Sequence, residues 1–206
     1  GEKHDTISKK GAVNATVSAK IFQLLEKNNV PTHFTKLVEP TLMLVHKLNM
    51  IPVEVVCRNI AAGHLVKSLP MFKKGDKLKI PLIEFYLKDD ALHDPLLVED
   101  HMVALGLAKR NEVNDIRKLT LKVNNILKRF MAKRKLLLVD FKIEFGRDTR
   151  GKIRLGDELN IDSMRLWDMA TGKNVDKDSY REGLSLEVVE KTYLDSYKRI
   201  IGLELK

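Results

Sequence analysis

The stretch LLLVDFKIEFGRDTRGKIRLGDELNIDSMRLWD, residues 136–168, decides the fold. Apolar and charged residues alternate along its first part with the period of two that is typical of a half-buried strand. One predicted face carries Val139, Phe141, Ile143 and Phe145. The other face carries Asp140, Lys142 and Glu144. The RDTRG segment predicts the turn of a hairpin, and the returning strand has Ile153 and Leu155 as its apolar residues. One face of this hairpin should therefore pack into a core, and the other should meet water or a ligand.

The returning strand brings a further carboxylate to the hairpin. Strict alternation places Asp157 with the apolar residues, which is a poor environment for a carboxylate. Gly156 permits a β-bulge that would turn Asp157 toward the side of Glu144. Two carboxylates that converge beside Lys142 would form a site for Mg²⁺ carrying nucleotide phosphates. The alternative is a solvated strand face with cross-strand ion pairs, and the alternation alone favours that alternative.

Composition limits the class of protein. The chain has 206 residues, 44% of them hydrophobic and 32% charged, which is enough for one large domain or two small lobes that share a core. No apolar run approaches the length of a membrane span, and no signal peptide is recognisable. The single cysteine, Cys57, excludes an intramolecular disulfide and fits a reducing compartment. The net charge of +9 suits nucleic acid, an anionic membrane surface or small polyanionic substrates such as nucleotides.

The rest of the chain predicts strand hairpins and separate helices. Helical periodicity begins at residue 11 and is stopped by Asn28-Asn29 and Pro31; it recurs over 98–109 and 112–133, and a C-terminal helix should begin near Ser185. The segment TLMLVHKLNMIPVEVVCR predicts two strands around a turn near Asn49-Met50, and KIPLIEFYLKDD predicts another strand. This arrangement indicates an α+β fold.

Several segments could bind an anion or a metal. The P-loop, G-x-G-x-x-G, G-x-S-x-G and H-E-x-x-H motifs are absent. In CRNIAAGHLVK the backbone amides around Gly63 can face an anion, although a tight connection between strands with incidental charge is the favoured alternative. RLWD is expected in the loop beyond the two strands of the hairpin, where Arg165 beside the only tryptophan can hold a phosphate or a carboxylate and can equally pair with Asp168. The acidic segment KDDALHDP is more typical of a solvated loop than of a metal site.

Four segments, in chain order, resemble hallmark segments of one enzyme family. They are IPVEVVCRNIAAGHLVKS, KDDALHDP, LVDFKIEFG and GDELNIDSMRLWD. The family is that of phosphoribosylaminoimidazole-succinocarboxamide synthase, or SAICAR synthetase, and the resemblance extends from about Gly11 to the C-terminal helix. It implies a two-lobed α+β fold with ATP in the cleft between the lobes. Residues 1–50 would be the remainder of an N-terminal nucleotide-binding lobe that is incomplete in this chain. Residues 51–206 would be the C-terminal lobe that binds the substrates and Mg–ATP.

The resemblance also implies a reaction. The chain would be an ATP-dependent carbon–nitrogen ligase of purine biosynthesis, in which ATP activates the carboxylate of carboxyaminoimidazole ribonucleotide as an acyl phosphate. The amine of L-aspartate would then attack, giving the succinocarboxamide, ADP and phosphate. Mg²⁺ would be the cofactor, and a cytoplasmic homodimer with neither nucleic acid nor a membrane as partner is expected. The basic composition agrees, because all three substrates are anions and phosphoryl transfer depends on positioning and charge neutralisation.

Roles follow for the residues that match the family's segments. The predicted catalytic residues are Lys142, Glu144 and Asp157, and the last two would also hold the metal. The predicted substrate-binding residues are Arg58, His64, Lys67, Asp94 and Arg165. The predicted nucleotide-binding residues are Lys47, Leu48, Met50 and Glu54.

The chain departs from the family at two places. His64 stands where the family usually has serine, and we expect its ring to lie near the substrate phosphate, to which a histidine can donate. A short glycine-lysine loop that covers the ATP phosphates in the family is expected to precede Gly1. An alternative of another class is a basic RNA-binding module that uses the helix of residues 117–135, with its lysines and arginines, and the AAGH loop. A third is a kinase-like enzyme that acts on another small substrate.

Overall fold

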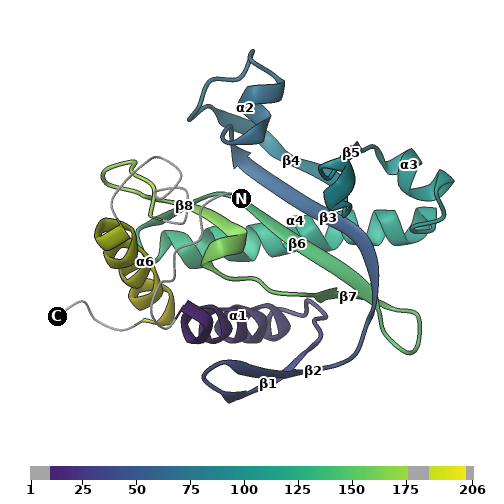
Figure 1. Cartoon of the computed structure of the whole chain (residues 1–206), viewed down its shortest axis with the longest axis horizontal. Coiled ribbons are helices and arrows are strands. Elements are labelled where there is room, and N and C mark those ends of the chain that lie inside the picture. Colours follow the sequence, from purple (N-terminus) through teal and green to yellow (C-terminus); the bar gives the residue numbers. More distant parts are fainter. Residues whose placement is uncertain (1–9, 176–185, 203–206) are drawn as a thin grey trace.

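The computed structural model describes residues 10–175 and 186–202 (Figure 1). Its helices are α1 (Lys10–Lys27), α2 (His64–Ser68), α3 (Glu99–Ala104), α4 (Arg110–Ala132) and α6 (Leu186–Ile201). Its strands are β1 (Phe34–Glu39), β2 (Leu42–Val45), β3 (Asn49–Ile60), β4 (Lys77–Leu87), β5 (Leu96–Leu97), β6 (Leu136–Arg147), β7 (Ile153–Gly156) and β8 (Met164–Asp168). β1 and β2 form a small sheet of their own, and the other strands form one antiparallel sheet. The predicted α+β class is confirmed.

The strand order of the large sheet is β5-β4-β3-β6-β7, and β8 also pairs with β6. β7 pairs with the end of β6 from Glu144 to Arg147, whereas β8 pairs with its beginning, from Leu136 to Phe141. The outer edge of β6 is therefore shared between two strands. This division matters for the site, because each half of β6 has different neighbours.

One face of the sheet is polar and the other is apolar, as the alternation in the hairpin predicts. Glu54 of β3 lies opposite Glu144 of β6, and Arg58 lies opposite Asp140. Side chains of directly opposed residues lie on the same side of an antiparallel pair. The apolar partners on the other face are buried, among them Val55, Cys57, Phe85, Phe141 and Ile143.

Helix α4 covers the apolar face. Figure 1 shows it behind β3 and β6, roughly along the sheet. Its predicted stripe packs into the core, with Ile116, Val123, Ile126, Leu127 and Phe130 buried and Leu119 partly buried. Because one face is filled in this way, only the opposite face is available for ligands.

Helix α1 and the β1–β2 sheet lie beside the large sheet and share its core. Val17, Ile21 and Phe22 of α1 belong to the same hydrophobic cluster as Phe145 and Leu155 of the large sheet. The predicted lobe boundary between residues 50 and 51 falls within β3, close to its beginning. The division into two lobes stays a prediction.

Three local predictions need correction. The turn near Asn49-Met50 is wrong, because both residues belong to β3 and pair with Arg147 and Gly146. The strand β2 instead pairs with β1, which the pattern did not predict, and the chain reverses between Glu39 and Leu42. The predicted helix over 98–109 is shorter, since α3 ends at Ala104, and RLWD is a strand rather than a loop. The predicted start near Ser185 lies outside the described residues.

Candidate active site

Two cavities open along the polar side of the sheet. The arginine cavity, of about 600 Å³, is lined by residues that include Arg58, Gly63, His64, Lys67, Lys142 and Arg165. The carboxylate cavity, of about 410 Å³, is lined by residues that include Lys47, Leu48, Met50, Lys88, Glu144 and Asp157. Most of the predicted site residues thus fall into two groups, and each group lines one cavity.

Asp140 organises the arginine cavity. This carboxylate is 6% exposed, and one of its oxygens accepts hydrogen bonds from Arg58 Nη1 at 2.9 Å and from Arg165 Nη1. Glu84 accepts from Arg58 Nε at 2.7 Å and from the Tyr86 hydroxyl at 2.9 Å. Burial lowers the pKa of Arg58, but the charges of Asp140 and Glu84 outweigh burial and leave that pKa raised. Both predicted anion-binding arginines are therefore fixed by a shared acid.

Arg165 does not pair with Asp168, which was the alternative left open by the sequence. Asp168 instead accepts from Arg199 Nη1 of α6 at 2.8 Å. The Arg165 guanidinium lies against the backbone of Gly63, where an added Cβ would be 2.8 Å from Nη2. Gly63 also has a φ of +58°, which a side chain would disfavour. Glycine is thus required here both for the backbone conformation and for the approach of Arg165.

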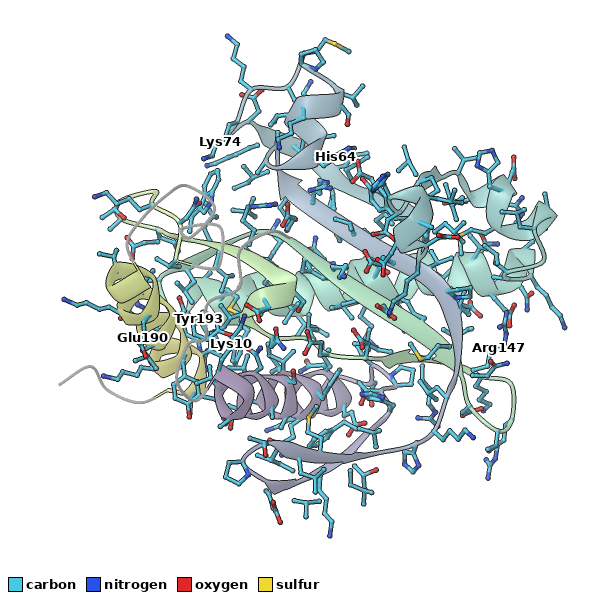
Figure 2. The ribbon with its side chains drawn as sticks, in the orientation of Figure 1. Lys10, His64, Lys74, Arg147, Glu190 and Tyr193 are labelled. Carbon is cyan, nitrogen blue, oxygen red and sulfur yellow. The ribbon has the colours of Figure 1, made fainter. Side chains whose placement is uncertain are left out.

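The other predicted residues of the arginine cavity come from α2 and β6. His64 begins α2 and lines the cavity, with the Ser68 hydroxyl 3.1 Å from each ring nitrogen. Figure 2 shows His64 and Lys74 where α2 and the loop after it stand beyond the end of the sheet. Lys142 forms an ion pair with Glu54. Five cationic side chains line this cavity against two carboxylates, so its surroundings favour an anionic ligand.

The carboxylate cavity contains Glu144, which is 4% exposed. Lys88 Nζ donates to its two oxygens at 2.7 and 3.0 Å. This hydrogen bond is the main cause of the raised pKa of Lys88. The ammonium of Lys88 therefore supplies a hydrogen-bonded counter-charge to this buried carboxylate.

Asp157 lines the same cavity as Glu144, but the predicted bulge is wrong. The β6–β7 pairing runs without a shift from Arg147 and Ile153 to Glu144 and Gly156. The strand β7 then ends, and Asp157 follows with a left-handed φ of +56°. A change of chain direction at the end of the strand, rather than an extra residue within it, removes Asp157 from the apolar face.

The predicted nucleotide-binding segment forms an apolar side of the carboxylate cavity. Leu48 and Met50 cross over two glycines of the β6–β7 hairpin. An added Cβ on Gly146 would be 2.8 Å from Leu48 Cβ, and one on Gly156 would be 3.1 Å from Met50 Sδ. The glycines therefore let this segment lie flat on the hairpin. Val45, Ile51 and Pro52 extend the apolar lining, which suits a flat ring system next to charged groups.

Two predicted site residues lie in neither cavity. Glu54 is on β3 between them, where it accepts the ion pair from Lys142. The Asp94 carboxylate accepts a hydrogen bond from the backbone N–H of Asp89 at 2.9 Å. The structure thus gives Asp94 a local role within its loop and does not bring it to the other predicted substrate residues.

Comparisons with known proteins agree with the resemblance in the sequence. A family model described as SAICAR synthetase matches residues 1–200. The phosphoribosylaminoimidazole-succinocarboxamide synthase of Methanothermobacter thermautotrophicus is 48% identical over 205 residues, which cover 100% of this chain and 80% of the relative. That of Sulfolobus acidocaldarius is 46% identical over 200 residues, or 97% of this chain and 85% of the relative.

Solved structures give the same result. A SAICAR synthetase in complex with ADP has a TM-score of 0.93 and 40% identity, covering 100% of this chain and 87% of that chain. A SAICAR synthetase from Pyrococcus horikoshii OT3 has a TM-score of 0.92 and 40% identity, covering 100% and 89%. The chain belongs to the SAICAR synthetase family. Its reaction is the ATP-dependent joining of L-aspartate to the carboxylate of carboxyaminoimidazole ribonucleotide.

The structure also identifies site residues of this synthetase that the sequence did not. Asp140 stands on the predicted polar face, so the alternation offered a signal for it. Lys88 was visible only as the first residue of KDDALHDP, and nothing local indicates that it reaches Glu144. Lys74, Asp162 and Asn174 also line the arginine cavity; Asp162 lies within the segment GDELNIDSMRLWD but was given no role, and no motif included Lys74 or Asn174.

The residues present fit a magnesium ion that is shared with a nucleotide. No cluster of three or more histidine, cysteine or acidic side chains able to hold a metal occurs among residues 10–175 and 186–202. Two carboxylates do line one cavity. Mg²⁺ is commonly held by one or two carboxylates together with substrate phosphates, and Glu144 and Asp157 offer that kind of donor. Within the same residues, no helix has the length and apolarity to cross a membrane.

Proposed function

We propose that the two cavities bind the two phosphorylated substrates of the ligase separately. The carboxylate cavity binds ATP with Mg²⁺, and the arginine cavity binds carboxyaminoimidazole ribonucleotide. The observation that carries this division is the contrast in lining. The carboxylate cavity has two carboxylates and two lysines beside an apolar segment, whereas the arginine cavity has five cations against two carboxylates. Because both lie on the polar side of the same sheet, the two substrates would meet along β6.

In the carboxylate cavity, Leu48 and Met50 pack against the adenine ring, and the backbone of Lys47 lies at its edge. Glu144 and Asp157 would hold the metal, which would supply charge neutralisation at the phosphate groups. Lys88 Nζ holds the Glu144 carboxylate by hydrogen bonds to both of its oxygens before the nucleotide arrives. These residues orient the ATP so that its terminal phosphate points along β6 toward Lys142.

In the arginine cavity, Arg165, His64 and Lys67 provide donors for the phosphate of the ribonucleotide. Arg58 is nearly buried and doubly paired, so we assign it to holding Asp140 and through it Arg165. Lys142 lies at the border of the cavities and neutralises the carboxylate as it accepts the phosphoryl group. The resulting acyl phosphate is open to attack by the amine of L-aspartate, with phosphate as the leaving group. The predicted contacts of Asp94 with substrate and of Glu54 with nucleotide stay predictions, as do the homodimer and the cytoplasmic location.

The test is release of ADP by the protein with Mg²⁺, ATP, carboxyaminoimidazole ribonucleotide and L-aspartate, with each component omitted in turn. Release should require all four, and a chelator should abolish it. Glu144→Gln and Asp157→Asn should each lower kcat by about 10³-fold, because each removes a charge from the centre that stabilises the transition state.

The matched control is Glu158→Gln, which makes the same change one residue beyond Asp157 and keeps an oxygen for the bond from Asn160 Nδ2. Its kcat should stay within twofold of wild type. Full activity of Asp157→Asn, or ADP release that does not need L-aspartate, would contradict the proposal. The second outcome would favour the kinase-like alternative.

A further inference from the structure

Tyr86 is a half-buried residue of β4 that lines neither cavity. Glu84 lies two residues before it and Lys88 two residues after it, so the three side chains share the polar face of the sheet. Glu84 holds Arg58 of the arginine cavity, and Lys88 holds Glu144 of the carboxylate cavity. Tyr86 therefore stands between a residue that serves one cavity and a residue that serves the other.

The hydroxyl of Tyr86 makes a contact on the side of the arginine cavity. It donates to Glu84 Oε2 at 2.9 Å, and the same oxygen accepts from Arg58 Nε at 2.7 Å. Burial and the charge of Glu84 raise the pKa of Tyr86, so the hydroxyl keeps its proton and remains the donor. Because two donors reach this oxygen, Tyr86 helps to fix the carboxylate that in turn fixes Arg58.

The ring of Tyr86 makes a second contact on the same side. It meets the ring of His64 almost perpendicularly, with the centroids 6.3 Å apart and an angle of 85° between the planes, which is a favoured arrangement of aromatic rings. His64 is exposed at the start of α2, where Figure 2 shows it, and it lines the arginine cavity. An exposed side chain loses rotamer entropy when it binds a ligand. Tyr86 and the hydroxyl of Ser68 restrict this imidazole before a ligand arrives.

These contacts are part of a closed ring that joins two strands and α2 to the arginines. In order, its members are His64, Tyr86, Glu84, Arg58, Asp140, Arg165 and Gly63, and the last of these precedes His64 in the chain. Each member is held from two sides. Tyr86 and Glu84 do not line the cavity, whereas the other members do, so these two residues can act on a ligand only through the others.

We propose that Tyr86 is a positioning residue for the groups that bind the ribonucleotide in the arginine cavity. Its hydroxyl fixes Arg58 through Glu84, and its ring orients the imidazole of His64. This inference rests on the proposed function, in which the arginine cavity binds carboxyaminoimidazole ribonucleotide. Replacement of Tyr86 should therefore raise the KM for the ribonucleotide and leave kcat and the KM for ATP almost unchanged.

The experiment is steady-state ADP release by the full chain, with the ribonucleotide and ATP varied in turn. Tyr86→Phe removes only the hydroxyl, and we expect a KM for the ribonucleotide about fivefold higher, the size of one lost hydrogen bond. Tyr86→Leu removes the ring as well, and the same KM should rise about twentyfold. For both variants, kcat and the KM for ATP should stay within twofold of wild type. If Tyr86→Leu does not fold, Tyr86→Met replaces it, because a flexible thioether fills the same space without a ring.

A double-variant cycle with His64→Ala tests the contact between the two rings. Once the imidazole is absent, the ring of Tyr86 has no partner to orient. In the His64→Ala background, Tyr86→Leu should therefore raise the KM for the ribonucleotide no more than Tyr86→Phe does. A full additional effect of Tyr86→Leu in that background would overturn the role of the ring.

The matched control is Tyr197→Phe, which makes the same change in another partly buried tyrosine. Tyr197 belongs to α6 and lines neither cavity. Both KM values should stay within twofold of wild type. Because Tyr86 also stands next to the carboxylate cavity, a general disturbance of the sheet would change both KM values. Equal increases for ATP and the ribonucleotide in Tyr86→Phe, or no change in either, would overturn the inference.

Arg165→Met separates the failure of this inference from the failure of the proposed function. If Arg165→Met leaves the KM for the ribonucleotide unchanged, the arginine cavity does not bind that substrate, and the proposed function must be revised. If Arg165→Met raises this KM and the Tyr86 variants do not, only the inference about Tyr86 fails.

Discussion

The two cavities use acids and bases in opposite ways, although both are built on the same face of β6. In the arginine cavity the carboxylate of Asp140 accepts hydrogen bonds from Arg58 and Arg165 and holds both cations in place. In the carboxylate cavity the ammonium of Lys88 donates to the carboxylate of Glu144 and holds it in place. These two carboxylates are only four residues apart on one strand. Their environments differ because the neighbouring strands differ.

The shared edge of β6 is the cause of that difference. Where β8 runs beside β6, it places Arg165 next to Asp140. Where β7 runs beside β6, it places Gly156 opposite Glu144 and leaves room for Leu48 and Met50. Because β6 pairs with β8 along one half and with β7 along the other, each half can contribute to the binding of a different ligand. The predictions below ask whether the cavities are as separate as this comparison indicates.

The largest effect is expected from Asp140→Asn. This change leaves the buried guanidinium of Arg58 and the partly buried one of Arg165 without their shared counter-charge, and removing one partner of a buried ion pair costs about 3–5 kcal/mol. We expect the free energy of unfolding in urea to fall by about 3 kcal/mol, because Arg58 keeps Glu84 as a partner. The KM for the ribonucleotide should rise at least about tenfold, while the KM for ATP changes less than twofold.

The control for this prediction is Asp168→Asn. Asp168 also accepts from an arginine, Arg199, but it lines neither cavity. It should reduce stability and leave both KM values unchanged. If Asp140→Asn raises the KM for ATP as much as that for the ribonucleotide, the two cavities do not act separately.

A smaller effect is expected from Gly63→Ala, compared with Gly172→Ala. Both glycines have a left-handed φ, of +58° and +67°, so each substitution should cost about 1–2 kcal/mol of stability. Only the Cβ at position 63 would meet the Arg165 guanidinium, because nothing lies within 4 Å of the Cβ position at residue 172. The KM for the ribonucleotide should therefore rise about tenfold in Gly63→Ala alone. An equal change of KM in both variants would show that Arg165 adapts and that Gly63 serves only the backbone.

The hairpin shows what the sequence could predict. The faces of β6 from Asp140 onward follow from a period of two, and the burial of Phe141, Ile143 and Phe145 confirms them. The prediction was wrong for Val139, which packs with Ile60, Ala62 and Trp167 in a separate cluster at the register shift between Leu138 and Asp140. The helix α4 follows from its apolar stripe for the same local reason. The two carboxylates of the hairpin do line one cavity, although the local mechanism at Gly156 was wrong.

The partners of these residues could not be predicted, because they depend on which distant strands lie side by side. Lys88 precedes Glu144 by 56 residues and Arg58 precedes Asp140 by 82 residues, so no local pattern joins them. The strand β1 has a largely exposed pattern without clear alternation, and the turn was therefore placed at Asn49-Met50 instead of before Leu42. Arg165 was expected in a loop, and its pairing with Asp140 follows only once β8 is known to lie against β6.

The smallest effect is expected at the border between the cavities, from Glu54→Gln. Glu54 pairs with Lys142, whose side chain is 42% exposed, and such ion pairs contribute only about 0.2–1 kcal/mol. Loss of the pair should leave stability almost unchanged and shift kcat by about two- to fivefold, because Lys142 is then less firmly held beside the reacting carboxylate. Both KM values should stay within twofold of wild type, and Lys142→Met should lower kcat far more. Steady-state kinetics with each substrate varied in turn measures all three quantities. A rise in the KM for ATP would instead place Glu54 in the nucleotide site, as the family resemblance predicted. The nucleotide site would then extend along β3 as far as Glu54.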